Sequence, residues 1–110
     1  MEITERKTAD IVTLSLSGKL DTTTAKTFEK KILAQIESGD RRFIIDLAQL
    51  DYISSSGLRV FILAGKRLNS ENGKMVLCSL KVPVREVFDI AGFLSIFSVY
   101  ASHDEATKNL

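Results

Sequence analysis

The sequence has few of the residues on which cross-links, zinc sites and many active sites depend. Among its 110 residues there is one cysteine and one histidine. Cys78 alone can form neither an intrachain disulfide nor a cysteine cluster for zinc, and in its apolar segment it should be a small buried hydrophobe. His103 lies in a polar stretch without a partner that would orient it for catalysis. We therefore expect His103 to be a solvated or capping residue.

Charge of one sign and long apolar runs are also missing. Fifteen basic residues oppose fourteen acidic ones, which gives no reason to expect nucleic acid or an anionic membrane as a partner. No apolar segment approaches the length of a transmembrane helix, and residues 1–7 lack the apolar core of a signal peptide. Apolar residues make up 45% of the chain, which is enough for a core. We expect one soluble cytoplasmic domain over residues 1–110.

Motifs of nucleotide-binding and hydrolytic enzymes are absent as well. The chain contains no G-x-x-x-x-G-K-[ST] loop, no G-x-G-x-x-G after a strand and no G-x-S-x-G elbow. A serine nucleophile would in any case need a base to activate it. Asp21, Asp46 and Asp51 are spaced like turn and capping acids, so we expect no metal site. No cofactor and no enzymatic activity are predicted.

Hydrophobic periodicity predicts an alternation of strands and helices. Apolar residues recur with a period of two in some segments and at helical spacing in others. Strands are expected at residues 2–7, 11–17, 42–47, 74–78 and 97–100, and helices at residues 23–38, after the serines from Leu58, from Pro83 to Ala91, and from Ser102. This order predicts an α/β fold, a mixed and mostly parallel sheet of four to five strands with four helices packed on it.

Polar segments follow three of the predicted strands. They are residues 21–24, 54–56 and 79–81. The carboxyl ends of parallel strands share one edge of the sheet, where α/β folds place their sites. We therefore expect the functional surface at this edge.

Three consecutive serines, Ser54, Ser55 and Ser56, stand between an apolar strand and an amphipathic run. A serine hydroxyl can cap a helix, and a helix start also accommodates a phosphate. The residues alone leave two interpretations open. One serine is a phosphorylation switch, or the segment is only a turn with an N-cap.

The pattern Asp46-Leu47…Leu50-Asp51-Tyr52-Ile53-Ser54-Ser55-Ser56-Gly57-Leu58 resembles the signature of STAS domains, and more narrowly that of bacterial anti-sigma-factor antagonists. The segment 18–21, Gly-Lys-Leu-Asp, matches the G-x-L-D turn of that family. The segment 81–93 resembles its penultimate helix and F-x-x-x-G-[LF] ending. The three segments stand in the family's order and span nearly the whole chain. The resemblance implies a single STAS domain over residues 1–110.

The resemblance also implies a mechanism. In that family an anti-sigma factor that is a serine kinase phosphorylates the antagonist, and a PPM-type phosphatase removes the phosphate. Carried onto this sequence, the phosphoacceptor is Ser55. Ser54 replaces the family's frequent Asp, Ser56 is expected to be structural, and Asp21 matches a loop acid near the partner interface. The predicted partner-binding residues are Asp21, Thr22, Ser54, Ser55, Ser56, Gly57 and Arg59, on a protein expected to be a monomer.

A second hypothesis is a STAS interaction or scaffold module in another signalling or transport assembly, without a sigma partner, or a small nucleotide-binding module. In that case the serines simply cap a helix and the partner binds elsewhere, along Arg59, Leu63, Lys66 and Arg67. A third hypothesis, the weakest of the three, is that the protein is an enzyme.

Overall fold

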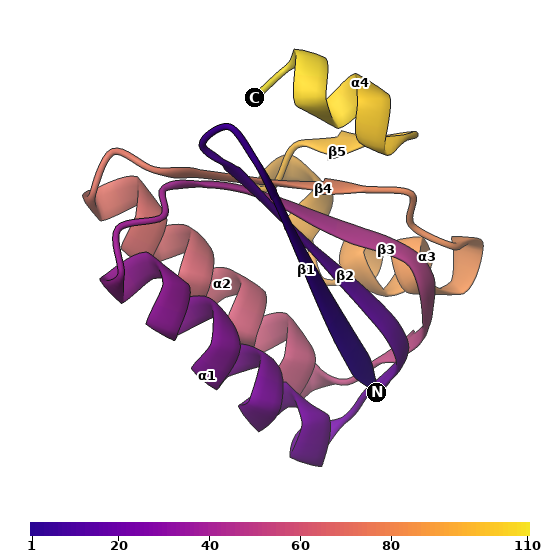
Figure 1. Cartoon of the computed structure of the whole chain (residues 1–110). Helices are drawn as coiled ribbons and strands as arrows, with labels where there is room; N and C mark the ends of the chain where they lie inside the picture. The colour runs from indigo at the N-terminus through magenta and orange to yellow at the C-terminus, as the bar shows by residue number, and fades with distance from the viewer.

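A five-stranded β-sheet forms the centre of this computed structural model, which describes all of residues 1–110 (Figure 1). The strands lie in the order of the sequence; β1 pairs antiparallel with β2, and all other pairs are parallel. Their bounds are β1 (Glu2–Thr8), β2 (Ile11–Leu20), β3 (Arg42–Ile53), β4 (Lys74–Cys78) and β5 (Val99–Tyr100). The predicted α/β fold with a mixed, mostly parallel sheet is confirmed.

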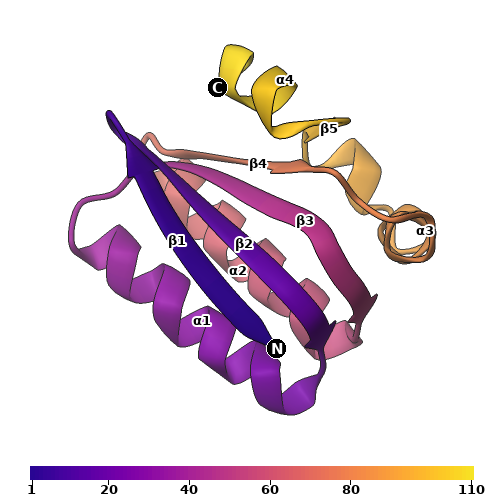
Figure 2. The same cartoon turned by 45° about the vertical axis from the view of Figure 1, so that its right-hand side comes forward.

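Four α-helices accompany the sheet, as predicted. They are α1 (Thr22–Glu37), α2 (Ser55–Ser70), α3 (Val82–Ile90) and α4 (His103–Lys108), and a 3₁₀ helix, η1 (Phe93–Ser95), follows α3. Figure 2 shows α1 and α2 side by side beneath the sheet and α4 on its opposite side. None of these helices is both long enough and apolar enough to cross a bilayer.

The core lies mainly between the sheet and helices α1, α2 and α3. In β3, Phe43 and Ile45 join this main cluster. Ile44 points the other way, into a smaller cluster with Val76, Cys78 and Ala106 of α4. Because successive side chains of a strand point to opposite faces, an uninterrupted apolar run is expected where both faces are covered. The prediction of a strand buried on both faces is confirmed.

Two strands run further than predicted. The expectation that β2 ends at Gly18 is wrong, because the strand continues to Leu20, and β3 continues past Leu47 to Ile53. Gly18 has a φ of +95° and lies at a break in the β2–β3 register. Glycine adopts such a backbone without strain, so it marks an irregularity inside the strand and not its end.

The boundaries of two helices also differ from those predicted. α2 begins at Ser55, three residues before the predicted start at Leu58, because the serines form its first turn. Its buried face comprises Gly57, Val60, Phe61, Ala64 and Leu68, while Leu58 is half-buried. The third helix, expected to run to Ala91, ends at Ile90, and Ala91 is exposed.

Candidate functional site

The carboxyl ends of β2 and β3 bring two of the predicted segments together. Leu20 and Ile53 are paired at the ends of these strands, and the Ser54 N–H donates to the Leu20 carbonyl at 2.9 Å. Asp21 follows Leu20 directly, so α1 and α2 start next to one another. The segment after β4 joins this edge through the Lys81 ammonium, which lies 2.5 Å from the Asp51 carboxylate. The three polar segments therefore lie along one edge, where the sequence places them.

The three serines have different structural roles. Ser54 is the N-cap of α2; its backbone is extended and its hydroxyl oxygen accepts a hydrogen bond from the Gly57 N–H at 3.2 Å. Ser55 is the first helical residue, is exposed, and its hydroxyl makes no hydrogen bond within the protein. Ser56 is half-buried. The capping function thus belongs to Ser54 and leaves the Ser55 hydroxyl free.

The start of α2 is electrostatically open to an anion. The first turn of this helix contains no acidic residue, and its only side-chain cap is the neutral hydroxyl of Ser54. A helix of 16 residues presents unpaired N–H groups and the positive end of its dipole at this position. A phosphate on the first residue would be held favourably there.

Asp21 caps the neighbouring helix α1. Its carboxylate accepts hydrogen bonds from the N–H groups of Thr23 at 3.1 Å and Thr24 at 2.9 Å. The Asp21 N–H in turn donates to the Thr24 hydroxyl at 2.8 Å, which completes a capping box. These bonds, chiefly those from Thr24, hold the pKa of the Asp21 carboxyl below its ordinary value. Asp21 and the following Thr22 are both exposed beside Ser54.

Gly57 and Arg59 complete the predicted surface, and only Arg59 is exposed. Gly57 is buried where α2 meets the ends of β2 and β3; a Cβ at this position would lie 2.8 Å from the Leu20 side chain. Arg59 lies one turn beyond Ser55, with its guanidinium 3.7 Å from the carboxylate of Glu29 on α1. Gly57 therefore positions the helix, whereas Arg59 is accessible.

Sequence reasoning missed two apolar side chains at this edge. Tyr52, three residues before Ser55 at the end of β3, is 50% exposed, and Val82 at the start of α3 is 68% exposed. Exposed aromatic side chains are enriched at protein interfaces. The available signal was that Tyr52 stands between two polar segments and not within the alternating part of the strand. Tyr52 is the penultimate residue of β3 and Val82 begins α3 after β4, so both lie near strand ends at the functional edge.

The alternative docking line along α2 remains a prediction. Arg59, Leu63 and Lys66 are exposed and Arg67 is half-buried. Because residues three and four apart are neighbours on a helix surface, these four side chains share the outer face of α2. Arg59 lies near Glu29 of α1, Arg67 forms an ion pair with Glu71, and Lys66 also lines a pocket beside the helix.

The remaining titratable candidates have local partners. His103 is half-buried, and its Nε2 lies 2.8 Å from the Thr13 hydroxyl, so the expectation of a solvated or capping residue is wrong; Ser102 is the cap of α4. Burial raises the pKa of the Cys78 thiol to about 11. The Asp46 carboxylate accepts from the Ala48 N–H, and nowhere do three His, Cys, Asp or Glu side chains gather as a metal site would require.

Comparisons with known proteins agree with this arrangement. Residues 2–106 match the STAS domain family. BtrV of Bordetella bronchiseptica, described as an anti-sigma factor antagonist, is 45% identical over 96% of this chain and 91% of its own length. The anti-sigma-B factor antagonist of Listeria monocytogenes is 32% identical over 99% and 95% of the two chains.

Solved structures show the same fold. An anti-sigma factor antagonist from Thermotoga maritima superimposes with a TM-score of 0.93, at 22% identity over 97% of this chain and 92% of that one. SpoIIAA in its unphosphorylated form gives a TM-score of 0.86, at 24% identity over 98% and 95%. At these identities the likeness concerns the fold alone.

Proposed function

This chain belongs to the STAS domain family and, within it, to the anti-sigma factor antagonists, and from that premise we propose that it is a binding switch controlled by phosphorylation of Ser55. Anti-sigma factor antagonists are regulators without enzymatic activity, and their partner is an anti-sigma factor. The proposal adds three things. The partner is a serine kinase, its target is Ser55, and a PPM-type phosphatase reverses the modification.

We choose Ser55 because the serine that caps α2 and the serine that is exposed are different residues. Ser54 contributes its hydroxyl oxygen to the cap of α2, so a phosphate there would disturb the helix start. Ser56 is half-buried. Ser55 is exposed and has no hydrogen bond to lose. A kinase can therefore reach the Ser55 hydroxyl without unwinding α2.

The chemistry is ordinary phosphoryl transfer carried out by the partners. The kinase transfers the γ-phosphoryl group of ATP to Ser55 Oγ; the bond between the γ-phosphorus and the bridging oxygen breaks, ADP leaves, and the hydroxyl proton passes to a base on the kinase. The phosphatase then hydrolyses the phosphoserine P–O bond with water, which releases inorganic phosphate and restores the hydroxyl. This protein supplies a substrate serine and the surface around it.

We propose that phosphate acts on the interface and not on the fold. It adds about −1.5 to −2 charges at neutral pH, which the first turn of α2 can hold by its dipole. The Asp51 carboxylate on this edge is paired with Lys81, and that of Asp21 caps α1, so the phosphate adds a negative charge without a side-chain partner in the protein. Burying that charge against a partner surface that fits a neutral hydroxyl is costly. The unphosphorylated form therefore binds the anti-sigma factor and releases the sigma factor, and the phosphorylated form does not.

The binding surface that we propose comprises Asp21, Thr22, Ser54, Ser55, Ser56, Gly57 and Arg59. The exposed side chain of Tyr52 extends it at the end of β3. We further propose that the protein acts as a monomer, which size-exclusion chromatography with light scattering would test.

The deciding experiment incubates the protein with its anti-sigma factor and ATP and maps the phosphate by mass spectrometry. We expect one phosphate on Ser55, none on Ser55→Ala, and unchanged phosphorylation of Ser56→Ala. Ser55→Ala should bind the anti-sigma factor constitutively, and Ser55→Asp should bind it weakly while unfolding at the same temperature. Phosphate on Ser54 or Ser56 in the wild type, or equal binding by the two Ser55 variants, would contradict the assignment.

A further inference from the structure

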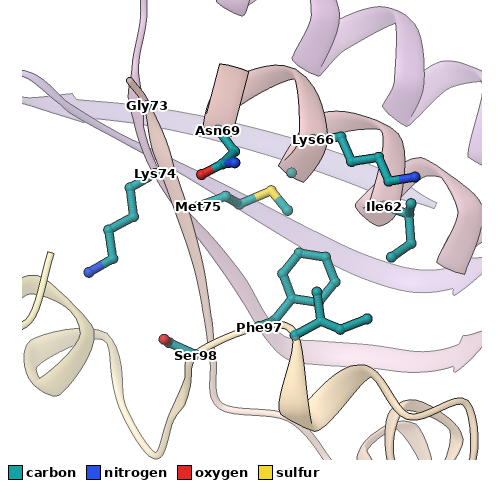
Figure 3. A pocket seen from close by; sticks show the side chains of 10 residues that line it. Ile62, Lys66, Asn69, Gly73, Lys74, Met75, Phe97 and Ser98 are labelled. Carbon is teal, nitrogen blue, oxygen red and sulfur yellow. The ribbon is translucent and has the colours of Figure 1, made fainter. Parts of the chain in front are cut away.

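A second candidate site lies at the opposite end of α2 from Ser55. It is a pocket of about 370 Å³ between the last turns of α2, the start of β4 and the segment after η1 (Figure 3). Ser55 and Asn69 are 14 residues apart on this helix, which corresponds to about 20 Å along its axis. The pocket is therefore separate from the proposed switch. It is lined by Ile62, Gly65, Lys66, Asn69, Gly73, Lys74, Met75, Ile96, Phe97 and Ser98.

The centre of the pocket is apolar and shaped by a glycine. Figure 3 shows the Met75 thioether and the Phe97 ring beside one another, with Ile62 on the wall formed by α2. At Gly65 a Cβ would come within 3.0 Å of the Phe97 ring, so the missing side chain lets the ring lie against the helix. Ile96, on the outer wall, is 60% exposed. Covering an exposed isoleucine beside an apolar hollow removes apolar surface from water, which is favourable in free energy.

The charged side chains around this hollow are all positive. Lys66 and Lys74 lie at its two ends, and no acidic residue lines it. Neither ammonium forms a salt bridge; that of Lys74 donates only to the backbone carbonyl of Asn109 at 3.2 Å. The Asn69 amide and the Ser98 hydroxyl make no side-chain hydrogen bond and add further donors. The chemistry of the rim thus favours an anion.

We propose that this pocket binds a small amphipathic acid, a molecule with a short acyl chain and one carboxylate. The chain would cover Met75, Phe97 and Ile96, and the carboxylate would lie at one end of the hollow, against the ammonium of Lys66 or Lys74. A volume of about 370 Å³ is near the lower end for ligand pockets, which run from about 300 to 1,000 Å³, and restricts the ligand to a small molecule. A lysine side chain is flexible enough to swing its ammonium over a bound anion.

Occupancy of this pocket should stabilise the folded chain without touching the switch. A ligand that binds only the native state raises its stability by mass action. The ligand would contact α2 near its C-terminal end, whereas the proposed partner surface lies at its N-terminal end. The proposal therefore does not rest on Ser55 being phosphorylated.

The test is a titration of the ¹⁵N-labelled full chain with octanoate, followed by amide chemical shifts. We expect saturable shifts at Gly65, Gly73 and Phe97 and none at Ser55. Octanol, which has the same chain length without the charge, should bind more weakly by up to about fivefold, the most that one exposed ion pair commonly contributes. No saturable shift at millimolar octanoate, or equal affinity for octanol, would overturn the proposal.

Charge-reversal variants locate the site. The double variant Lys66→Glu/Lys74→Glu should weaken octanoate binding by about fivefold or more, because it removes one exposed ion pair and puts repulsive charges in its place. Lys26→Glu/Lys30→Glu changes the net charge equally and is the matched control, because both lysines are exposed on α1, away from the pocket, and it should bind as the wild type does. Ile96→Ser removes apolar wall from an exposed position and should also weaken binding without unfolding the chain. Unchanged affinity in both pocket variants would overturn the proposal.

Discussion

Replacement by alanine should have different effects at the two adjacent serines at the start of α2. Ser54→Ala removes the hydroxyl oxygen that accepts from the Gly57 N–H. Ser55→Ala removes a hydroxyl that is exposed and has no partner in the protein. We predict that Ser54→Ala lowers the free energy of unfolding and keeps the proposed phosphoacceptor, whereas Ser55→Ala leaves stability unchanged and removes it.

The size of the effect follows from the cap. Loss of a serine N-cap costs about 1 kcal/mol, within a range of about 0.5–2 kcal/mol. The 3.2 Å bond is at the long end for a hydrogen bond, which favours the lower half of that range. For a chain of this length, 1 kcal/mol corresponds to a fall in melting temperature of about 4 °C. Surface substitutions such as Ser55→Ala usually stay within about 0.5 kcal/mol.

Urea denaturation followed by circular dichroism measures both variants, with Ser54→Asp as the matched control. Aspartate can also accept from the Gly57 N–H, and its charge suits the helix dipole, so Ser54→Asp should be at least as stable as the wild type. The reasoning would be refuted if Ser55→Ala were destabilised as much as Ser54→Ala. In that case the hydroxyl of Ser55, and not that of Ser54, would support the helix.

Three further outcomes can be measured on the same protein. The pKa of the Asp21 carboxyl is lowered in the folded state, so its contribution to stability is present above its ordinary pKa of 3.8 and is lost as pH falls through the lower folded pKa. Asp21→Asn should therefore reduce the pH dependence of the free energy of unfolding in this range, as measured by circular dichroism. Because burial raises the pKa of the Cys78 thiol to about 11, alkylation by iodoacetamide at pH 8 should be slow in the native protein and fast in urea. Gln35 is buried and its Oε1 accepts no hydrogen bond, so Gln35→Leu should raise the free energy of unfolding by about 1 kcal/mol. A variant whose free energy of unfolding in urea denaturation were about 1 kcal/mol lower would contradict this.

Most elements of the fold could be predicted from apolar periodicity, and β3 shows where that method fails. Its first half is the apolar run that the sequence makes obvious. In its second half the buried residues are Leu47, Leu50 and Ile53, spaced by three. A regular strand buries every second residue on one face.

The cause is the pairing with β2. Ser15 pairs with Asp46 but Ser17 pairs with Gln49, and Gly18 pairs with Leu50 but Lys19 with Tyr52. Each step gives β3 one more residue than β2, as in a β-bulge, which shifts the alternation. Gly18 is a local signal for the second irregularity, whereas the first, between Ser15 and Ser17, is set by contacts between the two strands and no glycine marks it.

The candidate site was predicted in position but not in detail, for the same reason. The order of strands places the polar segments on one edge, and the family resemblance selects Ser55. Which serine caps α2 depends on the residue at which β3 ends, and the bulges hide that residue. Tyr52 was missed likewise, because its exposure follows from the altered register of β3, and the polar residues around it in the sequence are a weaker signal.

Gly57 links this edge of the fold to the switch, and its replacement gives a final prediction. A Cβ at this position would lie 2.8 Å from Leu20 and 3.0 Å from Ile53, both buried. Alanine improves helix propensity by about 1 kcal/mol, but overpacking in a core costs about 1–3 kcal/mol, so Gly57→Ala should be destabilised.

The start of α2 should also move outward, which would displace Ser55 from Asp21 and weaken binding of the anti-sigma factor. Leu20→Ala relieves the contact at its own cost, so the cost of the double variant should be smaller than the sum of the single costs in urea denaturation. Additive costs would mean that Gly57 is required for something other than its close approach to Leu20. A coupling of the expected sign would show that the close approach of Gly57 to Leu20 sets the position of the start of α2, where the proposed phosphoacceptor Ser55 lies.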